Sequence, residues 1–145
     1  MGILLQRAEK PPVGVTKDAT VLLAVQTMVQ KRVGAVLVYE NDRAVGIFTE
    51  RDLMAKVVVK GLNVAETRVS SVMTSPVLMI APATPPAEAL TLMLEKHIRH
   101  LPVADPQGRV LGMLSIRNLL QDQIDDLKNS VDTLEAYATY DGASG

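Results

Sequence analysis

A seven-residue pattern occurs twice in this chain of 145 residues. The first copy is Gly46–Asp52, with the sequence GIFTERD, and the second is Gly112–Asn118, with the sequence GMLSIRN. Each copy completes an apolar segment and continues with a hydroxyl residue and an Arg-Asp or Arg-Asn pair that opens a predicted helix. Two similar copies in so short a chain indicate an internal duplication, so the fold must accommodate two related halves.

The same order of predicted elements leads to both copies. In the first half, apolar residues at helical spacing follow Asp18 or Thr20, either of which can cap the helix, and Gly34 is expected to end it. The stripe expected to be buried on this helix consists of Val21, Ala24, Val25, Met28 and Val29. The other elements expected there are an extended segment at 13–15, a buried strand at 35–39, a turn at 40–42, a strand at 43–48 and a helix at 51–60 stopped by Gly61.

The second half repeats this order at an offset of 65 residues, which becomes 66 after the turn at 105–108. One residue has therefore been inserted in a turn, where insertions are tolerated, and this supports the alignment of the halves. Thr84 is expected to cap the helix of this half, with Pro85 at its first position. The stripe expected to be buried consists of Ala89, Leu90, Met93 and Leu94. Extended segments are expected at 76–80, 101–104 and 110–114.

Two further segments lie outside the duplicated elements. Val69–Thr74 is expected to form a short helical lead-in to the second half, and Ile3–Leu5 is its shortened counterpart before the first. After the second motif, apolar residues alternate at spacings of four and three, which is a heptad pattern. They are Leu120, Ile124, Leu127, Val131, Leu134 and Ala138. We therefore expect a long final helix whose apolar edge contacts the body of the chain, a second copy or another protein.

The pattern Gly-apolar-x-Thr/Ser-x-Arg-Asp/Asn, found twice within a β-α-β-β-α order, resembles the cystathionine β-synthase (CBS) domain. The resemblance covers nearly the whole chain, from about residue 11 to residue 120. It implies an α/β fold of two βαββα CBS repeats with pseudo-two-fold symmetry and packed sheets, plus an extended C-terminal helix. The organisation expected is an N-terminal arm at 1–10, repeat 1 at 11–61, a connector at 62–75, repeat 2 at 76–121, and a helical extension and tail at 122–145.

Composition argues against several classes of function. A formal net charge of −1 and a pI of about 6.1 argue against a nucleic-acid-binding surface. The absence of cysteine excludes disulfides, thiolate metal sites and a cysteine nucleophile. The run Ile3–Leu5 is too short for the core of a signal peptide, and the other apolar segments are interrupted well short of a membrane span. We therefore expect a soluble cytoplasmic protein without a membrane partner.

Thr49 and Asp52 form the first candidate binding site, and the residues themselves allow two interpretations. Thr49 can cap the following helix while Asp52 complements its dipole. Alternatively, the hydroxyl and the backbone N–H groups can face a phosphate while the carboxylate accepts the hydroxyls of a ribose. The resemblance favours binding, because CBS pairs bind adenosine-containing ligands, and it implies that the opening strand of the same repeat holds the adenine. That strand supplies Val13, Gly14 and Val15.

Ser115 and Asn118 form the second candidate site. Asn118 has a neutral amide where the first motif has a carboxylate, so weaker binding is expected here. The opening segment of this half supplies Leu78, Met79 and Ile80. The resemblance also implies contacts from the basic residues of the motifs and from a basic pair before the strand at 101–104, namely Arg51, Arg117, Arg99 and His100. The residues equivalent to this basic pair are Gly34 and Ala35, so we expect the cleft between the repeats to be basic on one side only.

Three other groups of polar residues are assigned no site. His97 and His100 are too few ligands for zinc, so no metal is expected. Lys56 follows Asp52 by one turn and is expected on a solvated face, with a position near phosphates as the alternative. The pair Asp125–Asp126 is expected to be solvated. Because neither a nucleophile with its base nor a pair of catalytic carboxylates is recognisable, we expect no enzyme and no catalytic residue.

The function implied by the resemblance is regulation by an adenosine-containing ligand such as AMP, ADP, ATP, NAD or S-adenosylmethionine. The ligand is expected to favour a closed arrangement of the repeats and so to signal to a protein bound in trans. No cofactor is required for this role, and a homodimer is expected. The alternative is an assembly module whose clefts stay empty and which acts through dimerisation or its C-terminal helix.

Overall fold

The first half of the chain forms a three-stranded sheet covered by helices. The computed structural model describes the backbone of residues 4–144 and the side chains of residues 4–138. After α1 (Leu4–Arg7), the elements are β1 (Gly14–Thr16), α2 (Val21–Lys31), β2 (Ala35–Glu40), β3 (Arg43–Thr49), α3 (Glu50–Asp52) and the π-helix η1 (Leu53–Val58). β2 lies in the middle of the sheet, parallel to β1 and antiparallel to β3. The helix expected at 51–60 therefore begins as a short α-turn and continues with π geometry.

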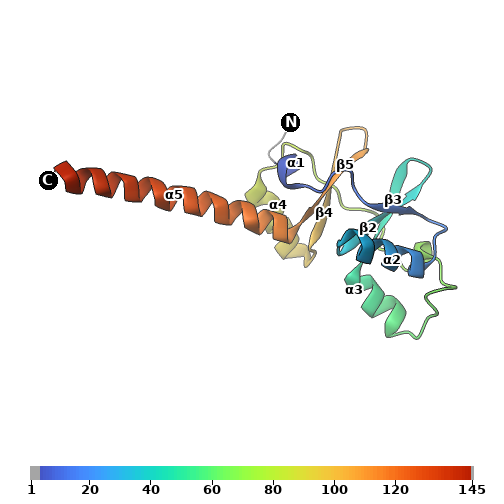
Figure 1. Ribbon diagram of the computed structural model, residues 1–145. Helices are drawn as coiled ribbons and strands as arrows, with labels where there is room; N and C mark the ends of the chain where they lie inside the picture. The colour runs from blue at the N-terminus through green and yellow to red at the C-terminus, as the bar shows by residue number, and fades with distance from the viewer. Residues whose placement is uncertain (1–3, 145) are drawn as a thin grey trace.

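The second half repeats this layout with a smaller sheet. Its elements are the 3-10 helix η2 (Val69–Ser71), α4 (Pro86–Lys96), β4 (His100–Ala104), β5 (Val110–Ser115) and α5 (Ile116–Ser144). β4 and β5 are antiparallel. The two halves lie side by side, and α5 projects far beyond both (Figure 1). The expected fold, two CBS-like α/β repeats with a long C-terminal helix, is thus observed.

The strand expected at 76–80 does not form, and a proline explains the difference. In the first half the N–H of Leu37 donates to the carbonyl of Val13 at 2.9 Å, which fastens β1 to β2. The residue equivalent to Leu37 in the second half is Pro102, which has no N–H to donate to Leu78. Only Ile80 pairs with β4, through bonds to Pro102 and Ala104.

The ends of the helices also differ from the expected ones. α2 ends at Arg32, which adopts the left-handed conformation with φ 57°, rather than at Gly34. The equivalent residue His97 ends α4 in the same way. Thr84 does not cap α4: Pro85 occupies the cap position without a side-chain bond, and the helix starts at Pro86. A residue before proline is pushed to extended conformations, so Pro86 keeps Pro85 outside the helix.

The buried stripes of α2 and α4 are narrower than expected. Val21, Ala24 and Met28 are buried in α2, whereas Val29 is 72% exposed. In α4 the equivalent of Val29 is Leu94, which is 61% exposed. Of the two expected caps of α2, Asp18 and Thr20, the structure confirms Thr20, since its hydroxyl accepts the N–H of Leu23.

The two lead-in segments pack against the opposite halves. α1 precedes the first half, yet Leu4 and Leu5 are buried in the core of the second. η2 precedes the second half, yet Val69 is buried in the core of the first. In Figure 1 the blue α1 accordingly lies beside the orange β5. The lead-in expected at Ile3–Leu5 is confirmed as helical from Leu4, while Ile3 lies outside the described residues.

The motif glycines allow this exchange of segments. Glu9 bridges to Met113 of β5, and at the equivalent place Thr74 bridges to Ile47 of β3. A Cβ on Gly112 would lie 2.9 Å from the Cβ of Ala8, so a larger residue there would collide with the crossing chain. Gly46 is equally confined, by the side chain of Met73. The glycine that opens each motif is therefore required by the crossing of the other half's lead-in.

Candidate ligand clefts

The first motif forms a complete cap at the start of α3. The hydroxyl of Thr49 accepts the N–H of Asp52 at 3.2 Å, and the carboxylate of Asp52 accepts the N–H of Thr49 at 3.0 Å. The hydroxyl of Thr49 also donates to the same carboxylate oxygen. The capping interpretation of these two residues therefore describes their geometry here.

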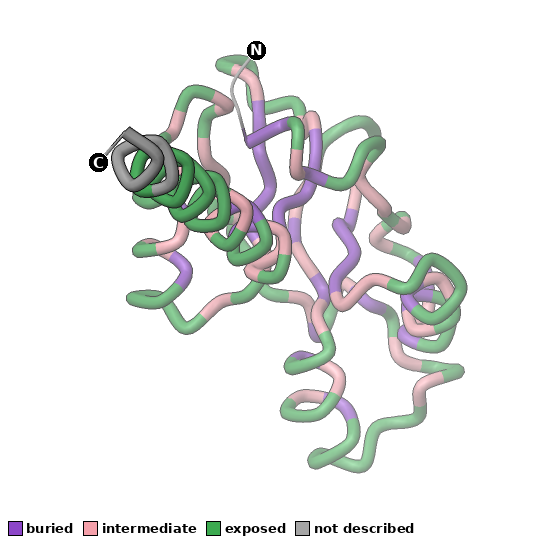
Figure 2. The backbone as a smooth tube through the Cα atoms, turned by 60° about the vertical axis from the view of Figure 1, so that its left-hand side comes forward, coloured by how far each residue is buried: buried purple, intermediate pink, exposed green. Residues whose placement is uncertain are grey.

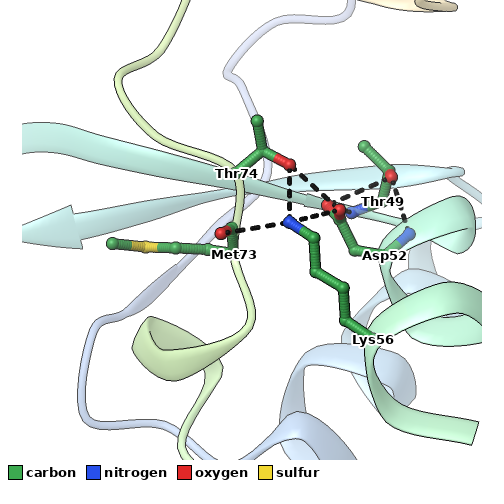
Figure 3. A network of polar contacts seen from close by, with 5 residues as sticks. All are labelled: Thr49, Asp52, Lys56, Met73 and Thr74. Carbon is green, nitrogen blue, oxygen red and sulfur yellow. Dashed lines mark hydrogen bonds and ion pairs between the residues drawn. The ribbon is translucent and has the colours of Figure 1, made fainter. Parts of the chain in front are cut away.

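The second oxygen of Asp52 is held by groups from outside the motif (Figure 3). The hydroxyl of Thr74 donates to it at 2.9 Å, and the ammonium of Lys56 lies 3.1 Å away. Lys56 also donates to the hydroxyl of Thr74 and to the carbonyl of Met73. The buried carboxylate thus joins the helix start to the segment that crosses from the other half. Lys56 points to Asp52, so its expected position on a solvated face is wrong.

The second motif has the same cap without these outside partners. The amide oxygen of Asn118 accepts the N–H of Ser115 at 3.0 Å and its hydroxyl at 2.6 Å, and Ser115 accepts the N–H of Asn118. The positions equivalent to Thr74 and Lys56 hold Glu9 and Asp122. Among the described residues, no side chain bonds to Asn118 as these two bond to Asp52. The two motifs are therefore alike in shape, but the carboxylate of the first is paired with a cation, whereas the amide of the second has acidic residues at the equivalent outside positions.

Two clefts open beside the motifs, and each combines the motif of one repeat with the opening segment of the other. The first cleft has a volume of about 540 Å³ and contains the first motif together with Pro76, Val77 and Leu78. The second cleft has a volume of about 420 Å³ and contains the second motif together with Val13. The expected pairing of motif and opening strand within one repeat is therefore wrong. The lead-in of each opening segment crosses to the other half, so it carries the segment to the other repeat's motif.

The structure brings most of the predicted site residues into these clefts. Thr49, Arg51, Asp52 and Leu78 line the first cleft, Val13, Ser115, Arg117 and Asn118 line the second, and Arg99 and His100 line both. The remaining four lie outside both linings: Gly14, Val15, Met79 and Ile80. Gly14 and Val15 pair with β2, and Ile80 pairs with β4, which turns their backbone groups into the sheets.

Basic residues enter the clefts from both repeats rather than from one. Lys96 and Arg99 of the second half line the first cleft, and Arg32 of the first half lines the second. The expectation of a cleft basic on one side only is therefore wrong. Glu50 lines both clefts and places one carboxylate among these cations. Both clefts can therefore bind an anion, but the anion would lie near the carboxylate of Glu50.

Arg51 makes a contact between the two repeats. Its guanidinium donates to the carbonyl of His97 at 3.1 Å, at the left-handed end of α4. This contact ties the first motif to the basic segment of the other half. A ligand that contacts the motif would therefore contact a residue that already bridges the repeats.

Several cleft residues were not predicted from the sequence. They are Arg32, Glu50, Thr74, Pro76, Val77 and Lys96. Pro76 and Val77 stand directly before Leu78. The predicted contacts of this segment, residues 78–80, therefore lie two residues too far along the chain. Thr74 and Arg32 reach the clefts only because lead-ins cross and the repeats face each other, which no local pattern indicates.

His100 lies half-buried between the clefts, and its surroundings disfavour its charged form. A Cβ on Gly34 would lie only 3.1 Å from its ring, so the glycine makes room for the imidazole. Burial lowers the pKa of His100 below its ordinary 6.5; Arg99 lowers it further, whereas Glu50 opposes the shift. The imidazole is therefore neutral at pH 7.

This shift predicts a loss of stability in mild acid. The unfolded chain protonates at the ordinary histidine pKa and the folded chain only at lower pH, so the contribution is present above pH 6.5 and is lost as the pH falls below it. Urea unfolding at pH 7.5, 6.5 and 5.5 should show a smaller decline for His100→Gln than for the unmodified chain. Parallel declines in the two proteins would contradict the assignment.

Neither a metal centre nor a membrane span is found in the described part of the chain. The described side chains, those of residues 4–138, include no group of three or more His, Cys, Asp or Glu placed to bind a metal ion. His97 is exposed at the end of α4, and His100 faces the clefts. No helix in the same residues is long and apolar enough to cross a membrane.

The sequence pattern that defines the CBS domain matches twice, at residues 7–59 and 69–125. The chain belongs to the CBS-domain family. A protein with CBS domains from Burkholderia ambifaria MC40-6 superposes with a TM-score of 0.81 at 35% identity, over 87% of this chain and 96% of that one.

Two other CBS proteins extend the comparison. The Arabidopsis thaliana CBS domain-containing protein CBSX3, mitochondrial, is 35% identical over 127 residues, which are 84% of this chain and 61% of that protein. This CBS pair thus spans less than two thirds of that relative's length. The CBS domain protein PAE2072 from Pyrobaculum aerophilum, complexed with AMP, superposes with a TM-score of 0.72 at 25% identity, over 79% of this chain and 88% of that one.

Proposed function

We propose that this CBS pair is a regulatory module that binds an adenosine-containing ligand, with AMP as the best-supported class, in the first cleft. The observation that carries the proposal is the composition of this cleft. It holds a carboxylate at Asp52, an apolar wall at 76–78 and cations at Lys96 and Arg99. These three kinds of group match a ribose, an adenine and a phosphate, and the PAE2072 complex shows that a CBS protein of similar fold takes AMP.

The size of the first cleft suits such a ligand. Small-molecule sites commonly have volumes of about 300–1,000 Å³ and combine apolar walls with a few placed polar groups. The first cleft, of about 540 Å³, lies within this range. Its apolar wall comes from the second half and its motif from the first. A ligand that contacts both would favour one relative position of the repeats, and this is how we propose that binding signals to a partner protein.

Binding at Asp52 requires an exchange of hydrogen bonds. The carboxylate already accepts bonds from Thr49 and Thr74 and pairs with Lys56. Ribose hydroxyls would replace the bonds of Thr74 and Lys56 on the outer oxygen, while the bond to the Thr49 N–H keeps the helix capped. Lys56 would then be released toward the ligand, where an ammonium can meet a phosphate. Because Thr74 lies in the crossing segment, the exchange would also loosen that segment from the motif.

The first cleft is expected to bind AMP more tightly than the second. Hydrogen bonds to a charged group contribute about 1.5–3 kcal/mol, against roughly 1 kcal/mol for neutral ones. Asp52→Asn removes the charge and retains an amide that can cap the helix, as Asn118 does in the second motif. Calorimetric titration with AMP should show the tighter binding event weakened about fivefold in this variant. Asn118→Ala should affect only the weaker event.

Two outcomes would count against this ranking. If Asn118→Ala abolishes binding while Asp52→Asn has no effect, the second cleft is the functional one. If the control Asp42→Asn, which removes a carboxylate from an exposed turn, weakens binding as much as Asp52→Asn, the effect is general electrostatics rather than contact with the ligand. Absence of binding by AMP, ADP, ATP, NAD and S-adenosylmethionine would refute the proposed function itself.

The second candidate function is an assembly module with empty clefts. It is favoured by the complete satisfaction of the first motif by protein groups and by the exposed apolar edge of α5. A thermal-shift series with adenine nucleotides separates the two functions. A ligand at one hundred times its dissociation constant adds about 2.7 kcal/mol of stability, whereas an assembly module would not respond.

A further inference from the structure

The C-terminal helix α5 leaves the body of the protein with an uncovered apolar edge. Leu119 and Asp122 are buried, and the guanidinium of Arg7 bonds to Asp122 and Asp125. In the described chain, Asp125 makes the last hydrogen bond or ion pair between α5 and the body. The helix continues to Ser144, about 28 Å further at 1.5 Å per residue. Residues 126–138 are all exposed, and Figure 2 shows this part of the helix in green as it leaves the body.

This projecting segment is poorly suited to exist as an isolated helix. Its middle is Asn129–Thr133, where five consecutive residues have moderate or low helix propensity. Helices of this length are marginal in water even when they are rich in alanine, and most helical stability in proteins comes from packing of an apolar face. The exposed apolar residues must therefore have a partner if the helix is to persist in solution.

The apolar edge has the residue types of a two-stranded parallel coiled coil. In heptad notation the a positions hold β-branched residues and then alanine, and the d positions hold leucine only. The a residues are Ile124, Val131 and Ala138, and the d residues are Leu120, Leu127 and Leu134. β-branched residues at a combined with leucine at d favour two parallel strands over three or four. Each of the five a and d residues between Leu120 and Leu134, both included, is at least 46% exposed.

The charges of α5 are compatible with this pairing. The aspartates of the helix between its start and residue 135 occupy the outer positions b, c and f, namely Asp122, Asp125, Asp126 and Asp132. The positions that flank the edge, e and g, hold Gln121, Gln123, Lys128, Ser130, Glu135 and Tyr137. In a parallel pair, g and the following e of the partner are neighbours, which places Gln123 beside Lys128 and Ser130 beside Glu135. No like charges meet across the edge, although the helix is acidic overall.

We propose that α5 pairs with α5 of a second copy of this chain in a parallel two-stranded coiled coil, in register from Leu120 to Ala138. The two-fold axis then runs along the helices, and the two CBS pairs lie together at the N-terminal ends of the two α5 helices. The inference is independent of any ligand, because it rests on α5 beyond the clefts.

Sedimentation equilibrium on the full chain tests the pairing. The unmodified chain should be a dimer at micromolar concentration. The double variant Leu127→Lys/Leu134→Lys should raise the dimer dissociation constant at least ~100-fold, since each change places a charge in the apolar edge. The matched double variant Asn129→Lys/Thr133→Lys adds the same charges at outer positions and should remain a dimer. Urea unfolding of all three should show that the CBS repeats stay folded.

Engineered cysteines test the orientation, because the chain contains no cysteine of its own. Ile124→Cys lies near one end of the edge, so two copies meet only when the helices are parallel and in register. This variant should form disulfide-linked dimers on mild oxidation, whereas Asp126→Cys, at an outer position, should not.

Each other outcome overturns the proposal. A monomeric unmodified chain at tens of micromolar excludes the second copy as the occupant. A dimer that survives Leu127→Lys/Leu134→Lys pairs through another face. Preferential cross-linking between Ile124→Cys and Leu134→Cys chains, with no Ile124 homodimer, would show that the helices are antiparallel.

Discussion

Replacing both Leu4 and Leu5 with alanine is expected to lower the free energy of unfolding by about 4 kcal/mol or more. The two side chains are 1% and 3% exposed, and leucine-to-alanine changes in a core typically cost about 2–5 kcal/mol each. The expected location of the damage is unusual. Because α1 packs into the core of the second half, protection from hydrogen exchange should fall first in β4 and β5, which are distant from α1 in sequence but adjacent to it in space.

Urea unfolding gives the free energy, and native-state hydrogen exchange gives the location. The matched control is Leu22→Ala/Leu23→Ala on α2, because both leucines are partly exposed and should cost much less. Loss of protection confined to β1–β3, the sheet that follows α1 in the chain, would contradict the exchange of lead-ins. A loss below about 1 kcal/mol would contradict the burial of α1 itself.

Asp52→Ala is expected to lower the free energy of unfolding by about 2–3 kcal/mol. The change removes a helix cap, which costs about 0.5–2 kcal/mol, and also deprives Thr74 and Lys56 of their common acceptor. Lys56 is 38% exposed and can turn to water, which limits the total. Asp52→Asn should cost less than Asp52→Ala, because its amide oxygen can still accept the N–H of Thr49.

The comparison of these two variants separates the structural role of Asp52 from its proposed role in binding. Unfolding in urea without ligand measures the first role, and titration with AMP measures the second. Asn118→Ala is the matched variant in the other repeat, where the cap has no outside partners, so it should cost about 1 kcal/mol less than Asp52→Ala. Equal losses in the two repeats would show that Thr74 and Lys56 contribute nothing to stability.

The duplicated motif carried most of the fold prediction. Its two copies, the helical and strand periodicities around them and the single inserted residue at 105–108 predicted the order of the elements. The structure confirms the strands after α2 and α4 and the positions of both motifs. These features depend on local patterns of apolar and polar residues, which a sequence displays directly.

The predicted elements were wrong where two local signals competed or where a residue distant in sequence determined the local structure. Pro85 follows a good capping residue, Thr84, but Pro86 excludes Pro85 from the helix. The segment at 76–80 is apolar enough for a strand, yet Pro102 removes the N–H that would fasten it to the sheet. Val29 and Leu94 lie at the margin of their helical stripes. Helical spacing alone does not show how far the neighbouring surface extends over such a stripe.

The sequence by itself determined that two related halves exist, where each motif lies, and that α5 carries a heptad edge. Only the tertiary structure decided that α1 and η2 exchange halves and that each cleft combines one repeat's motif with the other repeat's opening segment. The physical reason is that periodicity shows which face of an element is apolar but not which element covers it. Because the two halves are so alike, either partner would satisfy the pattern, and only the packed cores distinguish them.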